Sequence, residues 1–426
     1  MSSNHGNSQN LNDYSQWSKE QLIERLKHLE GKSTTTSSSS NVVSETQAVK
    51  LTQPMKKSKK KKEFDFSKYT TRHIALRFAY LGWSYQGLAI QNQETELPTV
   101  ESEILKALFK IKLIGSLEPQ ACNFSRCGRT DKGVSAMNQV ISLTLRSKLS
   151  ADELISPEND QKELDYIRIL NQVLPPDIRF HSVCLRPPKD FDARFSCTYR
   201  HYKYFFNGRG LNVEKMREAA SYYLGENDFR NFCKVDGGKQ ITVFKRGVLR
   251  SEISQLEDDD RFYVFDLKGT AFLWHQVRCM VAVLLSVGQG LEEPTIVKRL
   301  LDPVEFPSRP AYNMAHDIPL TLYDCGFNED EVKWSYGDGK ENLHHLEFNG
   351  LWNDIQIKAI TANFMKKSVF GPLKSNIDRV VVNLGDGRGS VSGKYIPLEK
   401  RPRLETPEQI NAKWRNKKKR TIEEVE

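Results

Sequence analysis

The residues best able to do chemistry lie in one loop near position 130. Residues 127–136 read CGRTDKGVSA, which places the carboxylate of Asp131 close to the cations of Arg129 and Lys132 and between two glycines. A carboxylate presented in this way can act as a nucleophile or a base on an anionic substrate. The same residues also suit a structural turn in which Asp131 accepts backbone N–H groups, and the loop alone leaves both readings open.

A second segment interleaves aromatic and cationic side chains. Residues 191–204 read FDARFSCTYRHYKY, and alternation along a strand puts Arg200, Tyr202 and Tyr204 on one face. Aromatic rings beside cations hold single-stranded RNA by stacking on its bases. A core strand with tyrosine hydroxyls at its rim has the same pattern, so this segment is also open to two interpretations.

A third segment places an arginine at the start of an apolar helix. Residues 272–278 read FLWHQVR and open the most apolar helical stretch of the chain. A cation at a helix N-terminus opposes the helix dipole, and burying it alone is costly. We therefore expect Arg278 to pair with a carboxylate. Asp266 is the local candidate, and Asp131 is the distant one.

The net charge of +9 is carried by the two ends of the 426-residue chain. Residues 1–70 contain 12 Lys and Arg against 7 Asp and Glu, residues 386–426 contain 11 against 7, and the middle has 40 of each. The length predicts two domains, or one domain with long appendages. A basic surface for nucleic acid must therefore come from the ends or from local clustering on a neutral body.

The cysteines and the apolar runs indicate the class of protein. Seven cysteines, an odd number, are scattered without the spacing of a zinc site, and the start MSSNHGNSQN has no apolar signal core. This pattern favours a cytosolic or nuclear protein over a secreted one with disulfides. The longest apolar run, 279–287, has nine residues, whereas a membrane span needs about 20. We expect no membrane span.

Strands and helices are predicted around the three segments. Alternating apolar residues predict strands over 73–80 and 137–145, and three- and four-residue spacing predicts a helix over 100–111 between them. Further helices are expected at 164–173, 213–224, 274–288 and 346–370, and further strands at 177–185, 199–206 and 262–267. Because the two kinds of element do not alternate regularly, the expected fold class is α+β.

The N-terminal end is predicted to differ from the rest. Residues 11–31 have the capping-box and leucine spacing of a helix, and residues 32–50 are rich in Ser and Thr, which indicates disorder. Residues 56–62 then read KKSKKKK. This run suits a nuclear localisation signal, an electrostatic tether for RNA or merely a solvated tail.

Four segments together resemble the tRNA pseudouridine synthase A family in order and spacing. They are 127–139, 191–204, 224–229 and 272–288, and the resemblance covers roughly residues 72–330. Within the family, the lead-in 125–128 and the segments AYLGWSYQG (79–87) and RPAY (309–312) are most similar to the eukaryotic tRNA pseudouridine(38/39) synthases. The related eukaryotic subfamily that modifies other tRNA and small nuclear RNA positions is the nearer competitor.

The resemblance implies a role for individual residues of this chain. Asp131 matches the catalytic aspartate, Tyr202 the tyrosine over the target base, Arg278 the arginine paired with that aspartate, and Arg129 the arginine that helps to extrude the target nucleotide. The residues expected to bind substrate are Arg129, Lys132 and Tyr204. His201 stands where many bacterial members have arginine and Trp274 where they have histidine, and both departures affect RNA contacts rather than the catalytic set.

The implied reaction fits these residue types. Converting uridine to pseudouridine breaks the N1–C1′ bond, turns the uracil and rejoins it through C5. An ionised Asp131 can add to C1′ or C6 or remove a proton, and the sequence does not choose between these roles. Tyr202 would stack on the uracil and could assist removal of the C5 proton. The uridine must be flipped out of its helix, which costs a few kcal/mol. The family needs no cofactor and no metal.

The family fold is two α+β halves whose antiparallel sheets join into one extended sheet, with the active-site cleft between them. The expected divisions are a mostly disordered basic extension with a short helix at 1–70, the half carrying the Asp131 loop at 71–185, the second half at 186–330, an extension with a helix at 331–385 and a basic tail at 386–426.

The expected activity is isomerisation of uridine at positions 38 and 39 of the tRNA anticodon stem-loop, in the nucleus and cytoplasm. tRNA is the expected partner, no membrane is, and the bacterial relatives imply a homodimer. The alternatives are a synthase of the competing subfamily, an inactive tRNA-binding chaperone, and an RNA-binding scaffold driven by the tails alone.

Overall fold

The computed structural model describes residues 64–91, 93–336, 342–370 and 379–423. The helix expected over 11–31 and the lysine run over 56–62 lie outside these residues. No helix in the described ranges is both long enough and apolar enough to cross a membrane.

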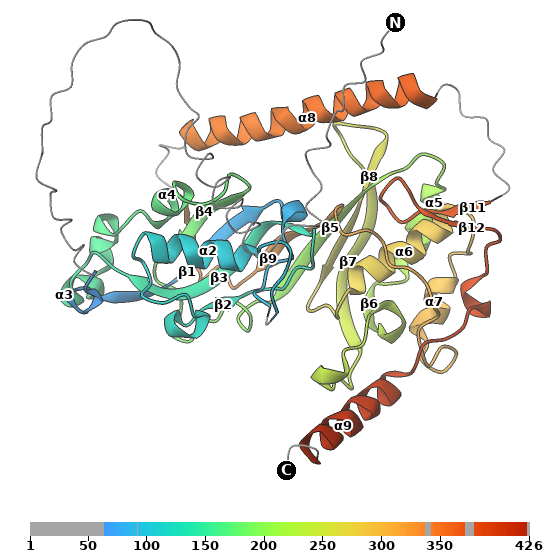
Figure 1. Ribbon diagram of the computed structural model, residues 1–426, viewed down its shortest axis with the longest axis horizontal. Coiled ribbons are helices and arrows are strands. Elements are labelled where there is room, and N and C mark those ends of the chain that lie inside the picture. Colours follow the sequence, from blue (N-terminus) through green and yellow to red (C-terminus); the bar gives the residue numbers. More distant parts are fainter. Residues whose placement is uncertain (1–63, 92, 337–341, 371–378, 424–426) are drawn as a thin grey trace, which may run out of the picture. The chain divides into compact units, whose positions relative to one another are not determined.

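A ten-stranded, mainly antiparallel sheet runs through both halves of the fold (Figure 1). Its order is β10-β4-β1-β3-β9-β5-β8-β7-β6, with β2 paired to β3. The strands are β1 Thr71–Tyr80, β2 Ser125–Arg126, β3 Ser135–Arg146, β4 Ile178–Cys184, β5 Tyr199–Asn207, β6 Gly225–Asp228, β7 Lys245–Gln255, β8 Phe262–Gly269, β9 Leu320–Gly326 and β10 Ser335–Tyr336. The expected α+β class with one extended sheet is confirmed.

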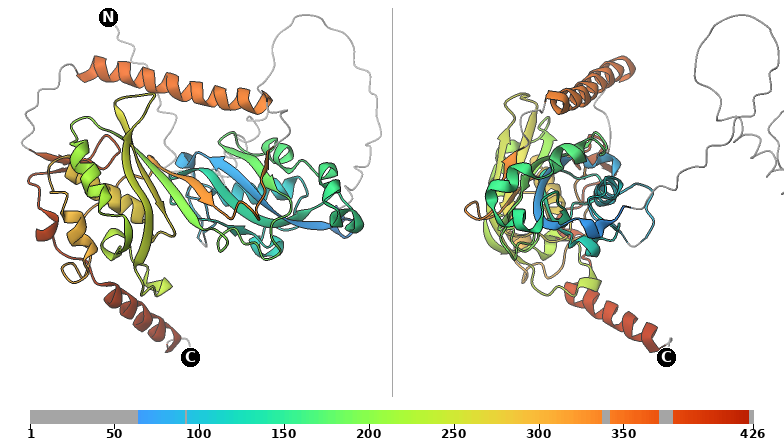
Figure 2. Two further views of the ribbon diagram at one scale, coloured as in Figure 1. Left: turned by 180° about the vertical axis from the view of Figure 1, so that it is seen from behind. Right: turned by 90° about the vertical axis from the view of Figure 1, so that its left-hand side faces the viewer.

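Strand β9 joins the two halves of the sheet. It runs parallel to the start of β3, where Ser135 and Ala136 pair with Thr321 and Leu322. On its other side it runs antiparallel to β5. A strand from late in the chain therefore closes the gap between two earlier strands. The strands of the second half are seen from behind in Figure 2.

The first half packs helices α2 (Val100–Lys110) and α4 (Tyr166–Asn171) on β1, β3 and β4. Helix α2 begins at a capping box in which the Thr99 hydroxyl accepts the Ser102 N–H and the Ser102 hydroxyl accepts the Thr99 N–H. Its apolar residues, spaced by three and four positions, lie in the core, as the sequence pattern predicted.

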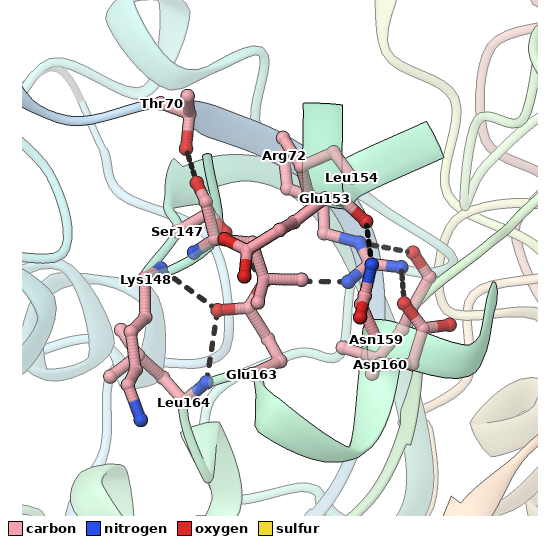
Figure 3. A network of polar contacts seen from close by, with 12 residues as sticks. Thr70, Arg72, Ser147, Lys148, Glu153, Leu154, Asn159, Asp160, Glu163 and Leu164 are labelled. Atoms are coloured by element: carbon pink, nitrogen blue, oxygen red, sulfur yellow. Dashed lines mark hydrogen bonds and ion pairs between the residues drawn. The ribbon is translucent and has the colours of Figure 1, made fainter. Parts of the chain in front are cut away.

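A buried arginine anchors the segment 147–163 to the first strand (Figure 3). The guanidinium of Arg72 lies 2.7 Å from Asp160 and 3.3 Å from Glu163, which also accepts the Ser147 hydroxyl at 2.6 Å and the Lys148 N–H at 2.9 Å. Burial raises the pKa of Glu163, but these donors outweigh it and hold that pKa below its ordinary value. The carboxylate therefore stays ionised, and helix α3 (Ala151–Ile155) and the turn η4 (Pro157–Lys162) are fixed beside the sheet.

The second half has its own core, built on helix α6 (Gln276–Gly288). Every residue of α6 except Arg278 is buried, and helices α5 (Val213–Ser221) and α7 (Ile296–Leu301) pack in the same core. The short turns of the fold are η1 Phe66–Lys68, η2 Gly82–Ser84, η3 Pro119–Cys122, η5 Arg230–Phe232 and η6 Gly237–Lys239.

The C-terminal residues correct one expected division. Residues 379–406, which include β11 (Val380–Val382), β12 (Ser390–Ser392) and the turn η7 (Leu398–Lys400), pack on the second half instead of forming a separate tail. Leu398 is buried in the second core, and its N–H donates to Glu292 at 2.7 Å. The segment 379–406 is mostly polar, and an apolar residue such as Leu398 attaches it to the second core.

Two helices complete the C-terminal region, and they differ in their contacts. Helix α9 (Pro407–Glu423) packs against η6 through its first turns. Helix α8 (Asn342–Phe370) is the helix expected near 346–370, and its described side chains are exposed or half-buried.

Candidate active site

One cavity between the two halves brings most of the predicted site residues together. It has a volume of about 1300 Å³. Its lining includes Arg129, Asp131, Lys132, Tyr202 and Arg278. These residues come from the loop before β3, from strand β5 and from the start of α6, so three segments that are far apart in the chain share one space.

The Asp131 loop is tied to the first half by hydrogen bonds on both sides of the carboxylate. The Thr130 hydroxyl lies 2.7 Å from the Tyr80 hydroxyl, and the Thr130 carbonyl accepts the Leu88 N–H at 3.2 Å. Gln139 on β3 makes two hydrogen bonds of 3.3 Å with the backbone of Gly128. The loop is therefore held on the end of the sheet.

Two glycines of the segment 79–87 make room for this loop. A Cβ on Gly82 would lie 2.0 Å from the Val134 carbonyl oxygen, and one on Gly87 would lie 2.8 Å from the Thr130 carbonyl oxygen. Gly87 also has a φ of +97°, which residues with a side chain rarely adopt. The glycines thus allow two backbones to touch behind Asp131, which gives a physical role to a segment that the sequence marked only by resemblance.

Asp131 faces a histidine across the cavity. Its Oδ2 lies 3.4 Å from Nε2 of His275, and the two side chains are 26% and 10% exposed. His275 is the N-cap residue of α6 with a left-handed φ of 61°, and its buried Nδ1 has no hydrogen-bond partner among the described residues. The other carboxylate oxygen of Asp131 has no such partner in the described ranges, and the residue lines the cavity.

Arg278 does not pair with Asp131, and this corrects the expected ion pair. Its Nη2 lies 3.9 Å from Oδ2 of Asp317, and its Nε donates to the Ala315 carbonyl at 2.8 Å. The local candidate, Asp266, instead contacts His201 at 2.6 Å. The carboxylate that pairs with Arg278 therefore comes from the loop before β9 and not from the Asp131 loop.

Asp317 links Arg278 to the Asp131 loop. A Cβ on Gly133 would lie 2.9 Å from Cγ of Asp317, so the carboxylate group rests against the backbone two residues after Asp131. The Ile318 N–H also donates to Asp317 at 2.9 Å and fixes its orientation. Sequence reasoning missed Asp317 because no motif marks it and its neighbours in the site are more than 35 positions away.

Tyr202 lines the cavity, whereas Tyr204 does not. The ring of Tyr202 meets Phe272 edge-on, with centroids 5.2 Å apart. Burial raises the pKa of the Tyr202 phenol, with smaller contributions from the Cys325 thiol and the Asp131 carboxylate, so the hydroxyl stays protonated. Tyr204 is 0% exposed in the second core, and its hydroxyl donates to the Leu384 carbonyl at 3.3 Å. The expectation that Tyr204 binds substrate is thereby corrected, since it is a core residue.

Arg200 ties the two walls of the cavity together. Its guanidinium donates to the Cys127 carbonyl at 2.9 Å, to the Arg194 carbonyl at 3.0 Å and to the Thr270 carbonyl at 3.1 Å. The Cys127 carbonyl begins the Asp131 loop, and the Thr270 carbonyl precedes the α6 segment. One side chain on β5 therefore sets the spacing of both loops, a role that the sequence left unassigned.

Exposed cations and aromatic rings surround the mouth of the cavity. Arg129 and Lys132 are exposed and make no ion pair with any residue in the described part of the chain. Phe195 is 79% exposed, and Trp274 has the amines of Lys234 and Lys239 at 5.8 and 5.7 Å from its ring centroid. Rings that stack on bases and cations that bind phosphates are the groups that hold single-stranded RNA.

Comparisons with known proteins identify the family of the chain. A family model described as tRNA pseudouridine synthase matches residues 219–328. The tRNA pseudouridine(38/39) synthase of Saccharomyces cerevisiae is 52% identical over 410 residues, which are 95% of this chain and 92% of that protein. The human tRNA pseudouridine(38/39) synthase is 42% identical over 70% of this chain, which spans 64% of the human protein. The tRNA pseudouridine synthase A of Methanosarcina mazei is 33% identical over 61% of this chain and 86% of its own length.

Proposed function

The chain belongs to the tRNA pseudouridine synthase family and isomerises uridine to pseudouridine in tRNA, and from this premise we propose that its targets are positions 38 and 39 of the anticodon stem-loop. The proposal is supported by the near full-length similarity to the yeast protein of that name. It is also supported by the mouth of the cavity, where exposed rings and unpaired cations suit a nucleotide taken out of a stem or its junction.

The observation that carries the proposal is the meeting of Asp131 and Tyr202 in one cavity. Both side chains line the cavity that a flipped uridine would enter, and His275 faces one oxygen of the Asp131 carboxylate. Asp131 is therefore the nucleophile or base. Because Asp131 is only partly exposed and faces a histidine, its carboxylate is held in one orientation when the base arrives.

Tyr202 acts as a protonated phenol in this arrangement. Burial raises the pKa of the phenol, and its ring lines the cavity, so we expect it to stack on the uracil or to donate a hydrogen bond. We expect Tyr202→Phe to keep most of the turnover, because the ring remains, and Tyr202→Ala to lose about 100-fold. Single-turnover rates on unmodified tRNA measure both. Equal losses in the two variants would assign the effect to the hydroxyl.

The decisive experiment maps pseudouridine in tRNA treated with the wild-type protein and with Asp131→Ala. We expect product at positions 38 and 39 from the wild type and a loss of at least about 1000-fold in the variant. The tRNA affinity of the variant should stay within a few-fold, because a carboxylate does not attract phosphates.

The other outcomes separate the alternatives. Pseudouridine at other positions would instead assign the chain to the related eukaryotic subfamily that modifies other tRNA and small nuclear RNA positions. A wild-type protein that binds tRNA but makes no product would be a chaperone. Full activity in Asp131→Ala would remove Asp131 from the catalytic role.

We also propose that the chain works as a homodimer in the nucleus and cytoplasm. The exposed apolar side chains of α8, among them Phe348, Trp352 and Phe364, support the first part, the homodimer. The lysine run at 56–62 supports the second. Light scattering of wild type and Trp352→Glu tests the dimer, and microscopy of a fluorescent fusion with these lysines changed to alanine tests the localisation. A monomeric wild type, or an unchanged distribution, would contradict the respective part.

A further inference from the structure

The most basic element of the described chain is helix α9, and it is docked beside the cavity. Its residues Pro407–Glu423 include six Lys and Arg against two Glu, whereas residues 71–385 are neutral in sum. The helix is about 25 Å long at 1.5 Å per residue. Figure 1 shows it projecting away from the second half of the fold. The positive charge of the described chain is therefore concentrated on α9, while the body of the fold is neutral.

The first turns of α9 are held by specific contacts. Asn411 is 3% exposed, its side chain donates to the Ile241 carbonyl at 2.9 Å, and its own carbonyl accepts from Gln240 at 3.2 Å. The Trp414 side chain lies over the turn η6, where a Cβ on Gly237 would meet the Trp414 Cβ at 2.9 Å. The helix is therefore attached in one orientation.

The surface that carries α9 is also part of the cavity wall. Asp236, Lys239 and Ile241 line the cavity, and the same stretch of chain forms the seat of Trp414 and Asn411. Lys239 lies beside the ring of Trp274 on that wall. A ligand that leaves the cavity over this wall reaches α9 directly.

Three cations of α9 beyond the seat have no polar partner in the described part of the chain. The side chains of Lys417, Lys419 and Arg420 are exposed and make no ion pair or hydrogen bond with any residue the structure describes. On the cavity wall, Arg246 donates only to the Val243 and Lys245 carbonyls and has no carboxylate partner in the described ranges. Lys239 on the wall and Lys413 on α9 pair with Asp236 and Glu405, so the cations left without a carboxylate in the described ranges include Arg246 at the cavity and the three at the far end of α9, and these suit a polyanion that spans both.

We propose that α9 is a docked arm that binds backbone phosphates of the tRNA outside the target nucleotide; this rests on the proposed function, because the polyanion is the substrate. The interaction is electrostatic and independent of base sequence. It should therefore contribute to affinity and to its salt dependence rather than to the chemical step.

The experiment compares two triple variants of the full chain. Lys417→Ala, Lys419→Ala and Arg420→Ala remove three charges from α9, and Lys358→Ala, Lys366→Ala and Lys367→Ala remove three from α8, another exposed helix. We expect the α9 variant to weaken tRNA binding about tenfold at physiological salt and to lower the slope of log Kd against log salt by about 1 to 2. Turnover at saturating tRNA should match the wild type. The α8 variant should bind as the wild type does.

A second variant separates the docked arm from a loose tether. Trp414→Ala keeps every charge but removes the side chain that seats the helix on η6, so it should also weaken binding, with folding checked by thermal melting. Unchanged tRNA binding in the α9 triple variant would overturn the proposal and leave an acidic protein as the partner. If tRNA affinity falls in the α9 triple variant but not in Trp414→Ala, the docked position of the helix is not needed for binding, and that part of the proposal is wrong. Absence of pseudouridine from wild-type reactions would instead contradict the proposed function, so the two failures are distinct.

Discussion

The first wall of the cavity, the Asp131 loop at 127–134, has a second backbone packed directly behind it in addition to its side-chain hydrogen bonds, whereas in the second wall, residues 271–278, the charged group of Arg278 is placed by side-chain contacts. Behind the first wall, two glycines let another loop touch its backbone. In the second wall, Arg278 is placed by its own hydrogen bond to the Ala315 carbonyl and by Asp317, and His275 by a left-handed backbone conformation.

The difference indicates that one wall fixes the position of the Asp131 carboxylate and the other supplies the charged groups around it. Backbone contacts have no rotamer freedom, so they suit the group whose position must be reproducible, the carboxylate of Asp131. Side-chain contacts suit groups that orient the carboxylate, because charge interactions fall off gradually with distance. Substitutions behind the two walls should therefore have different consequences for turnover.

The largest effect should follow from substituting Gly87. Gly87→Ala introduces a strained φ and a Cβ 2.8 Å from the Thr130 carbonyl, so the Asp131 loop must move, and we expect turnover to fall about 100-fold. Gly210→Ala is the matched control, since Gly210 has a φ of +74° but nothing within 4 Å. It should cost about 1 kcal/mol of stability and leave turnover unchanged. Equal turnover in Gly87→Ala and Gly210→Ala would contradict the inference that the backbone packed behind the loop positions Asp131.

His275 should have an intermediate effect. Asn also adopts the left-handed conformation readily, so His275→Asn removes the imidazole while keeping the backbone, and we expect turnover about tenfold lower with tRNA affinity unchanged. His275→Ala adds backbone strain at φ 61° and should lower thermal stability as well. Single-turnover rates and melting curves separate the two contributions. Wild-type turnover in His275→Asn would remove the histidine from the positioning of Asp131.

Asp317 should have a smaller effect, because it acts through Arg278 and Gly133. Asp317→Asn keeps the size of the side chain and its acceptor for the Ile318 N–H but removes the charge that attracts Arg278. We expect turnover to fall a few-fold at low salt, with the difference from wild type shrinking as salt rises. A loss that is independent of salt would point to packing against Gly133 rather than to the charge.

The Arg72 network lies away from both walls and should affect only stability. Because the folded state lowers the pKa of Glu163, its contribution is complete above the ordinary value of about 4.3 and is lost as the pH falls through the lower folded pKa. Glu163→Gln should therefore lower stability at pH 7 by about 1–3 kcal/mol and lose less on acidification than the wild type. Denaturant unfolding from pH 7 to pH 3 measures this, and turnover at pH 7 should be unchanged.

The helices and strands expected between 73 and 288 are present with ends displaced by a few residues. Several strands were not anticipated, and the longest of them are β7 and β9. β7 carries charged side chains between its few buried residues, so its alternation is obscured. β9 is a short strand whose partners come from opposite halves of the sheet.

The sequence by itself determined the local features of the site. The Asp131 loop and the apolar helix that begins near Arg278 follow from residue types within one or two turns of chain, whereas the alternation on β5 put Tyr202 and Tyr204 on one face and did not choose between them. The family also followed from these segments, because their order along the chain is part of the sequence.

Only the tertiary structure decided which charges meet. His275 rather than Arg278 faces Asp131, Asp317 receives the arginine, Tyr204 belongs to the core, and α9 reaches the cavity wall. Each of these depends on where β9 and the C-terminal residues pack against strands that come much earlier. An ion pair forms with whichever carboxylate the fold brings within a few ångströms, and separation along the chain carries no information about that distance.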